Sequence, residues 1–174
     1  LVSEEFGKAH SAIRSLVGIS NGIGSKALVA SGSTEQKEKY LPRLASGELI
    51  AAFAVSEPNA GSDVSSILTH AKLEGDKYLL NGSKHFITNG PIADIFTVLA
   101  STDKAKGSRG GMSVFLIEKG TPGFSVGRIQ ETMGSRGCLR SELIFDNCVA
   151  PVDSIIDGEG KGFPIIMSCL AEGR

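Results

Sequence analysis

The stretch FAVSEPNAGSD, residues 53 to 63, changes character halfway along. Its first residues are apolar or small, as in a buried strand, and an acid, a proline and a run of small polar residues follow. A plain turn needs only about two or three such residues. The stretch therefore predicts a strand whose end offers enough hydroxyl and backbone N–H groups to bind a ligand.

The residues before this stretch have the pattern of helices. Apolar residues recur at near-helical spacing between residues 3 and 18. Ser33, with Gln36 three residues later, predicts a capping box at the start of a further helix. Pro42 is expected to begin a separate short turn, because proline removes a hydrogen bond from a helix interior.

From about residue 50 the pattern changes to short β-rich runs separated by turn residues, which predicts about six to eight strands. Asn81-Gly82, between two such runs, predicts a type I′ hairpin turn. After Pro151 the chain becomes polar, and residues 162–174 have the pattern of a new helix. Helices, then strands, then a helix predict an α+β fold with an antiparallel β-barrel or sandwich in the middle.

The composition excludes several function classes. The net charge of −1 argues against a nucleic-acid surface, since such domains are usually strongly basic. No apolar run has the length that a membrane span needs. The three cysteines lie far apart without a C-x-x-C pair, so neither a disulfide scaffold nor a metal site is predicted.

One glycine pattern resembles a nucleotide site. Gly22, Gly24 and Ala27 match the spacing of the dinucleotide fingerprint, which requires a strand before it and a helix after it. Helical sequence precedes these glycines, so we expect no NAD site here.

The segment AVSEPNAGSD resembles the signature of the acyl-CoA dehydrogenase family. Four further stretches match the family in order, namely KHFITNG from Lys84, SRGGMSVFLIEKGTPGF from Ser108, MGSRG from Met133 and SELIFDNCVAP from Ser141. The resemblance covers essentially the whole chain and is closest to the isovaleryl and short-chain branch.

This resemblance implies three parts. Residues 1–49 would be the end of an N-terminal helical domain, and residues 50–157 a middle β domain that binds flavin and acyl-CoA. Residues 158–174 would begin a C-terminal helical bundle, so that the chain is a fragment lacking most of that domain.

The resemblance also implies a site for FAD against the middle domain. The residues that would contact the cofactor are Phe53, Val55, Ser56, Gly61, Ser62, Phe86, Ile87 and Thr88. Ser56 keeps a hydroxyl where most family members carry threonine, and Phe86 stands where tryptophan is usual. Two alternatives remain open: the small polar residues serve only turns and a cap, or Phe86 and Ile87 are ordinary strand core.

For the acyl-CoA substrate, the resemblance implies contacts from Ser62, Ser108 and Arg109. An arginine suits the CoA part, because its planar fork can bond two phosphate oxygens. Arg136 is expected to be structural and to pair with Glu57. No histidine has a nucleophile or metal partner nearby in sequence, so none is expected to be catalytic.

The reaction implied is α,β-dehydrogenation of a short- or branched-chain acyl-CoA. In the isovaleryl branch the catalytic glutamate immediately precedes an arginine. Here Gly173 precedes Arg174, and Glu172 is one place too early, which on a helix is about 100° of rotation. No catalytic residue is therefore predicted in this chain, and the base is expected outside it.

Two alternative functions remain open. One is an acyl-CoA oxidase or reductase of the same fold, and the other is a non-catalytic flavin- or CoA-binding relative. For a dehydrogenase, the resemblance implies electron-transfer flavoprotein as the electron acceptor, a homotetramer or dimer, and roles in fatty acid metabolism and branched-chain amino acid catabolism. The compartment implied is the cytoplasm of a prokaryote or the mitochondrial matrix of a eukaryote.

Overall fold

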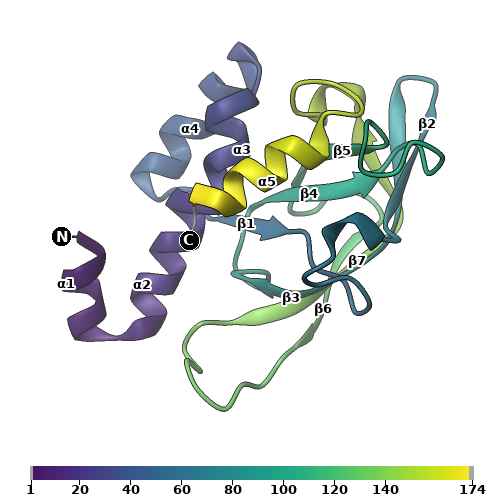
Figure 1. The fold of residues 1–174 in the computed structure, drawn as a ribbon. Helices are drawn as coiled ribbons and strands as arrows, with labels where there is room; N and C mark the ends of the chain where they lie inside the picture. Colours follow the sequence, from purple (N-terminus) through teal and green to yellow (C-terminus); the bar gives the residue numbers. More distant parts are fainter. Residues whose placement is uncertain (1, 173–174) are drawn as a thin grey trace.

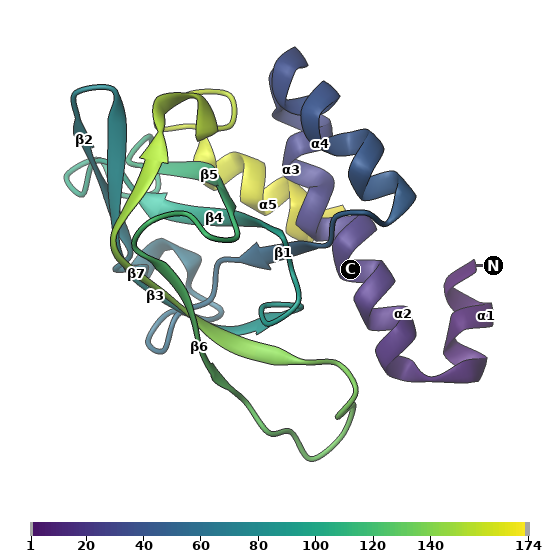
Figure 2. The same cartoon turned by 180° about the vertical axis from the view of Figure 1, so that it is seen from behind.

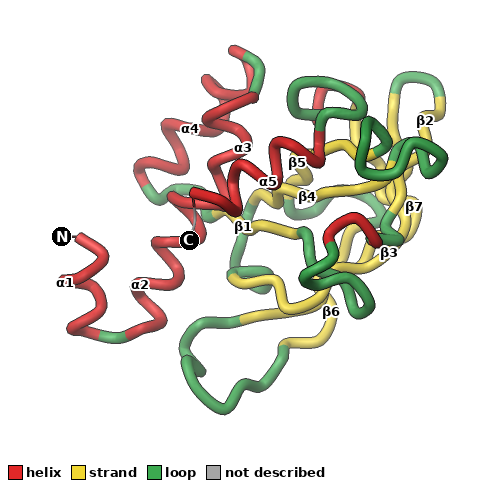
Figure 3. The backbone as a smooth tube through the Cα atoms, in the orientation of Figure 1, coloured by secondary structure: helices red, strands yellow, loops and turns green. Residues whose placement is uncertain are grey.

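The computed structural model describes residues 2–172 of the 174-residue chain. Its helices gather on one side and its strands on the other (Figures 1 and 3), which confirms the α+β prediction. The helices are α1 (Val2–Ala9), α2 (Ser11–Gly18), a π-helical stretch (Ile19–Ile23), α3 (Gly24–Ser31), α4 (Thr34–Ser46) and α5 (Gly162–Glu172).

Helix α4 begins with the predicted capping box. The Gln36 backbone N–H donates to Ser33 Oγ at 3.2 Å, and the Ser33 N–H donates to Gln36 Oε1 at 3.0 Å. The expectation for Pro42 was wrong, because this proline lies inside α4. Tyr40 and Leu44 are buried on either side of it, and their packing stabilises the helix across the missing hydrogen bond.

The strands form one seven-stranded sheet, in the order β1-β4-β2-β3-β7-β6, with β5 pairing with β4. They are β1 (Ala51–Ala54), β2 (His70–Glu74), β3 (Lys77–Thr88), β4 (Ile95–Ser101), β5 (Met112–Glu118), β6 (Phe124–Ile129) and β7 (Arg140–Pro151).

The sheet is mixed, whereas the short β-rich runs separated by turn residues predicted an antiparallel one. Strand β1 runs parallel to β4, with Ala51 opposite Ile95. Asp94 aligns the starts of the two strands, because its carboxylate accepts the Ile50 N–H at 2.9 Å and its own N–H donates to the Ile50 carbonyl at 2.8 Å. The sequence of a strand indicates which face of the sheet each side chain lies on. It does not indicate which distant strand will be the neighbour or in which direction that neighbour runs.

The predicted hairpin at Asn81-Gly82 was wrong, since both residues lie inside β3. Gly82 has a φ of 139° at a register shift against β7, and a Cβ there would lie 2.7 Å from Thr69 Cα. The β2–β3 turn instead uses Gly75, whose φ is 65°. An Asn-Gly pair marks positive φ equally in a turn and in an irregular strand, so the local pattern does not distinguish them.

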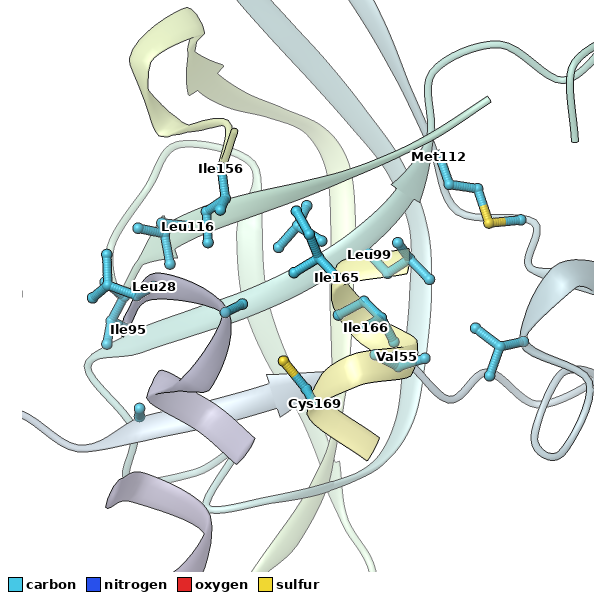
Figure 4. Close-up of a cluster of buried hydrophobic side chains, with 14 of the residues drawn as sticks. Leu28, Val55, Ile95, Leu99, Met112, Leu116, Ile156, Ile165, Ile166 and Cys169 are labelled. Atoms are coloured by element: carbon cyan, nitrogen blue, oxygen red, sulfur yellow. The ribbon is translucent and has the colours of Figure 1, made fainter. Parts of the chain in front are cut away.

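One hydrophobic cluster lies between the helices and the sheet, and a second is formed mainly by side chains of the sheet. Helices α3 and α5 lie side by side, as Figures 1 and 2 both show. In Figure 4, Leu28 of α3 and Ile166 of α5 belong to the same cluster as Leu99 and Val55. The residue that follows β1 is therefore part of the core, although the next residues leave it.

Two polar side chains also connect the helices to the start of β1. The Ala51 N–H donates to Ser20 Oγ of the π-helical stretch at 3.1 Å. Asn89 Nδ2 donates to the carbonyls of Leu16 at 3.2 Å and of Ala51 at 3.3 Å. The first residue of β1 is thereby bonded through both its N–H and its carbonyl.

Candidate functional site

The chain that follows β1 folds into a closed turn. The Glu57 N–H donates to the Ala60 carbonyl at 2.9 Å, and the Ala60 N–H donates back at 3.2 Å. Asp63 then caps a short 3₁₀ turn by accepting the Ser65 N–H at 3.1 Å. Part of the polar run thus serves a turn and a cap, whereas Gly61 and Ser62 between them are exposed.

Beneath this turn lies a buried ion pair that the sequence analysis missed. The Lys84 side chain is fully buried, and its Nζ lies 2.8 Å from Glu57 Oε1. Glu57 also accepts the backbone N–H groups of Leu68 at 2.7 Å and Thr69 at 3.0 Å. These three donors come from two other parts of the chain, so the carboxylate fixes several segments at once.

The predicted pairing of Glu57 with Arg136 was therefore wrong. Arg136 is exposed in the loop between β6 and β7, where its Nε donates to the Thr132 carbonyl at 3.1 Å. A signal for the true partner was present in the sequence. Lys84 stands at an inward position of β3, in step with Tyr78 and Leu80, and a lysine pointing into a core needs a counterion.

The pKa values of the pair reflect both its burial and its charges. Burial lowers the pKa of Lys84 to about 8, and the Glu57 carboxylate opposes this shift. Burial alone would raise the pKa of Glu57, but the Lys84 charge and the donated hydrogen bonds outweigh it and hold that pKa below its ordinary value. Glu57 is therefore a carboxylate at neutral pH.

We expect this carboxylate to make the protein sensitive to acid. The folded-state pKa of Glu57 lies below the ordinary value of 4.5, so its contribution to stability is present above that value and is lost as the pH falls through the folded-state pKa. Between about pH 6 and about pH 3, the free energy of unfolding measured with urea should fall more steeply for the wild type than for Glu57→Gln. Parallel curves for the two proteins would contradict the expectation.

Phe86 owes its exposure to a bulge in β3. Lys84 pairs with Leu143 of β7 and Ile87 pairs with Ser141, so the strand carries one extra residue between them. Phe86 takes a φ of 57°, and 61% of its surface is exposed. Because of the extra residue, Lys84 and Ile87 both point inward while Phe86 points out, which is how a bulge redirects a side chain.

The bulge lies beside the end of β1. The His85 N–H donates to the Ser56 carbonyl at 2.8 Å, and the His85 ring meets the Phe86 ring edge-on at 4.4 Å. The structure thus brings the half-buried Ser56 and the exposed Phe86 to neighbouring positions. The positive φ of Phe86 beside this hydroxyl makes the place a candidate ligand site.

The other predicted cofactor residues divide into two groups. Thr88 is half-buried opposite Arg140, and Gly61 and Ser62 are exposed. In contrast, the side chains of Phe53, Val55 and Ile87 belong to or pack against the hydrophobic core. For Ile87, the alternative of ordinary strand core therefore describes the side chain. The side chains of Phe53 and Val55 are likewise taken up by the core, so only the backbone of these three residues is left for a cofactor.

The predicted substrate residues lie in the loops that follow β1 and β4. Because these strands are parallel, both loops leave the same edge of the sheet. Ser108 is half-buried and Arg109 exposed in the second loop. This loop is closed by Gly111, whose N–H donates to the Gly107 carbonyl at 2.9 Å and whose carbonyl accepts the Thr102 N–H at 2.8 Å.

The prediction about a catalytic base stays untested. Helix α5 extends to Glu172 as expected, but Gly173 and Arg174 lie outside the described residues. Among the side chains that the structure describes within residues 2–172, no cluster of three or more from His, Cys, Asp or Glu is arranged to hold a metal. Over the same range, no helix combines the length and the apolar character of a membrane span.

Comparison with known proteins shows the family. Residues 52–148 match the acyl-CoA dehydrogenase middle domain, and residues 1–48 match the N-terminal domain of the same family. The chain is 51% identical over 143 residues to a short-chain specific acyl-CoA dehydrogenase of Clostridium acetobutylicum, covering 82% of this chain and 38% of that protein. It is 46% identical over 172 residues to isovaleryl-CoA dehydrogenase of Pongo abelii, covering 98% and 40%.

Solved structures agree with this match. Butyryl-CoA dehydrogenase of Megasphaera elsdenii superposes with a TM-score of 0.95 at 40% identity, over 98% of this chain and 45% of that one. An acyl-CoA dehydrogenase of Bacillus anthracis, complexed with FAD, gives a TM-score of 0.91 at 36% identity, over 99% and 29%. The chain belongs to the acyl-CoA dehydrogenase family, and it spans less than half the length of these relatives.

Proposed function

We propose that the full-length protein is an FAD-dependent acyl-CoA dehydrogenase that acts on short- or branched-chain acyl-CoA thioesters. The observation that carries this proposal is the bulge that exposes Phe86 beside Ser56 at the edge of the sheet. Family membership and the names of the relatives support it. An oxidase or reductase would use the same residues and differ in how electrons leave the flavin.

The residues at this edge fit FAD. A flavin has a flat apolar face and a polar rim, which suit an exposed phenyl ring and nearby hydroxyls. We assign the face to Phe86, the rim to Ser56 and Thr88, and the diphosphate to the exposed Gly61-Ser62 backbone. When bound, FAD supplies the acceptor for the hydride that leaves the β carbon of the thioester.

The chain's own residues would then position the substrate. Ser108 and Arg109 bind the CoA part, with the guanidinium donating to phosphate oxygens. Phe86 covers apolar surface at the site and excludes water there. We place the base that removes the α proton outside the described residues. Electron-transfer flavoprotein as acceptor, a homotetramer or dimer, and a cytoplasmic or mitochondrial-matrix location complete the proposal.

Cofactor identity is the direct test. We expect the full-length protein to purify with bound FAD and to bind NAD weakly, because no strand precedes Gly22 and Gly24 among the described residues and Gly22 lies at a kink between helices. The measurement is the visible absorption of the purified protein, followed by titration of the flavin-free protein with each nucleotide. Tight NAD binding without flavin would overturn the proposal.

A tryptophan at position 86 should strengthen flavin binding modestly. Phe86→Trp adds contact area on an already exposed ring, and we expect a gain of about 1 kcal/mol or less. Phe86→Leu, which keeps apolar bulk but removes the ring, should weaken binding by a similar amount. Fluorescence titration of the flavin-free variants measures both. Weaker binding by the tryptophan variant would show that the site accepts only the smaller ring.

A further inference from the structure

One ammonium group holds both neighbours of Ser56. Lys84 Nζ donates to the Val55 carbonyl at 3.0 Å and to Glu57 Oε1 at 2.8 Å. Ser56, which lies between them in the chain, has its own carbonyl bonded by the His85 N–H, from the residue next to Lys84. Two consecutive residues of β3 thus bond the backbone carbonyls of Val55 and Ser56 and the side-chain carboxylate of Glu57.

Stability alone does not account for this arrangement. Taking two charges out of water costs several kcal/mol per ion, and an apolar pair of similar volume often stabilises a core as well or better. The Lys84 side chain is 0% exposed and that of Glu57 is 4% exposed, so the cost applies to both. An apolar side chain at position 84 would fill the space, but it would provide no hydrogen-bond donor for the Val55 carbonyl.

The same strand turns outward immediately after the pair. Lys84 points inward and Phe86 points out two residues later, with the bulge between them. Lys84 is thus the buried residue of β3 that precedes the bulge and the exposed Phe86. Through its bond to the Val55 carbonyl it also fixes the segment that carries Ser56. Both assigned flavin contacts depend on the position of this one side chain.

We infer that Lys84 is a positioning residue that sets the direction of the Ser56 hydroxyl and of the Phe86 ring for the flavin. This inference rests on the proposed function, since it takes FAD as the group that those residues receive. It assigns the bond from Lys84 to the Val55 carbonyl, rather than charge pairing, as the contact on which flavin binding depends.

The two contacts can be separated by mutation. Glu57→Gln removes the carboxylate charge but keeps the lysine and its bond to Val55. Lys84→Met combined with Glu57→Gln removes both charges and the Val55 bond, so no unpaired buried charge remains. Lys84→Gln with Glu57→Gln serves as a second neutral pair if the first does not fold. Lys72→Met, which breaks the exposed ion pair with Glu74, is the matched control.

The full-length flavin-free variants are then titrated with FAD. We expect the dissociation constant to rise about tenfold to a hundredfold in the double variant, as for loss of a hydrogen bond to a charged group, and to change less than about threefold in Glu57→Gln and in the control. The visible band of bound flavin should shift in the double variant alone.

A second readout needs no cofactor. Hydrogen exchange of the His85 amide, which bonds the Ser56 carbonyl, should quicken in the flavin-free double variant and not in Lys72→Met. Wild-type exchange and wild-type FAD affinity in the double variant would overturn the inference and leave charge pairing as the only role. A wild type that binds no FAD would instead contradict the proposed function, while the exchange result would still test the positioning.

Discussion

Replacing Glu57 by leucine is expected to lower the free energy of unfolding by about 3–5 kcal/mol, because it leaves the buried Lys84 ammonium without its counterion. The backbone N–H groups of Leu68 and Thr69 lose their acceptor as well. Urea unfolding of the flavin-free protein at neutral pH, followed by circular dichroism, measures the change.

The matched control for this prediction is Glu74→Leu. Glu74 pairs with Lys72 at 2.9 Å on the surface, and such pairs contribute about 0–1 kcal/mol. The decrease in the free energy of unfolding caused by Glu57→Leu should therefore be several times that caused by Glu74→Leu. Similar losses at both positions would mean that the buried pair contributes no more than an exposed one.

Replacing Gly111 by alanine is expected to cost about 3 kcal/mol and to weaken acyl-CoA binding. A Cβ at this position would lie 2.0 Å from the Asp103 carbonyl oxygen and 2.6 Å from that of Gly107, both backbone atoms. The loop between β4 and β5 must then open, and it carries Ser108 and Arg109. Thermal unfolding gives the stability change, and the KM for butyryl-CoA reports the substrate contact.

Gly134→Ala is the control for the loop, since a Cβ there would meet nothing within 4 Å. We expect its stability and its KM to match the wild type. If Gly111→Ala lowers stability but leaves KM unchanged, Arg109 does not bind the CoA part, and the assignment of this loop to the substrate is wrong.

Some of the features that depend on neighbouring residues were predicted correctly from the sequence. The capping box of Ser33 and Gln36 is a pattern within one turn, and the α+β order follows from the change of hydrophobic period near residue 50. The parallel pairing of β1 with β4 joins residues more than forty positions apart in the chain, as with Ala51 and Ile95. No local pattern specifies such a partner.

The proposed flavin contacts came from the family resemblance, whereas the buried ion pair beneath them did not. Resemblance to a family located Ser56 and Phe86, and the structure places them side by side. The buried pair beneath them joins Glu57 to Lys84 across the β2–β3 hairpin, and sequence alone offered Arg136 as an equally good cation. Only the inward position of Lys84 on its strand could have distinguished the two.

Strand β1 has a mechanical consequence for the protein, because it is only four residues long and is bonded at each end. At its start, Ala51 is bonded to Ser20 of the helices and to Asn89, and just beyond its end Val55 is bonded to Lys84. Because β1 is short and extended, a movement at one of these bonded ends can be passed along its backbone to the other. We therefore expect a displacement of the helices along this strand to reach the segment that carries Ser56, where the proposed flavin site lies.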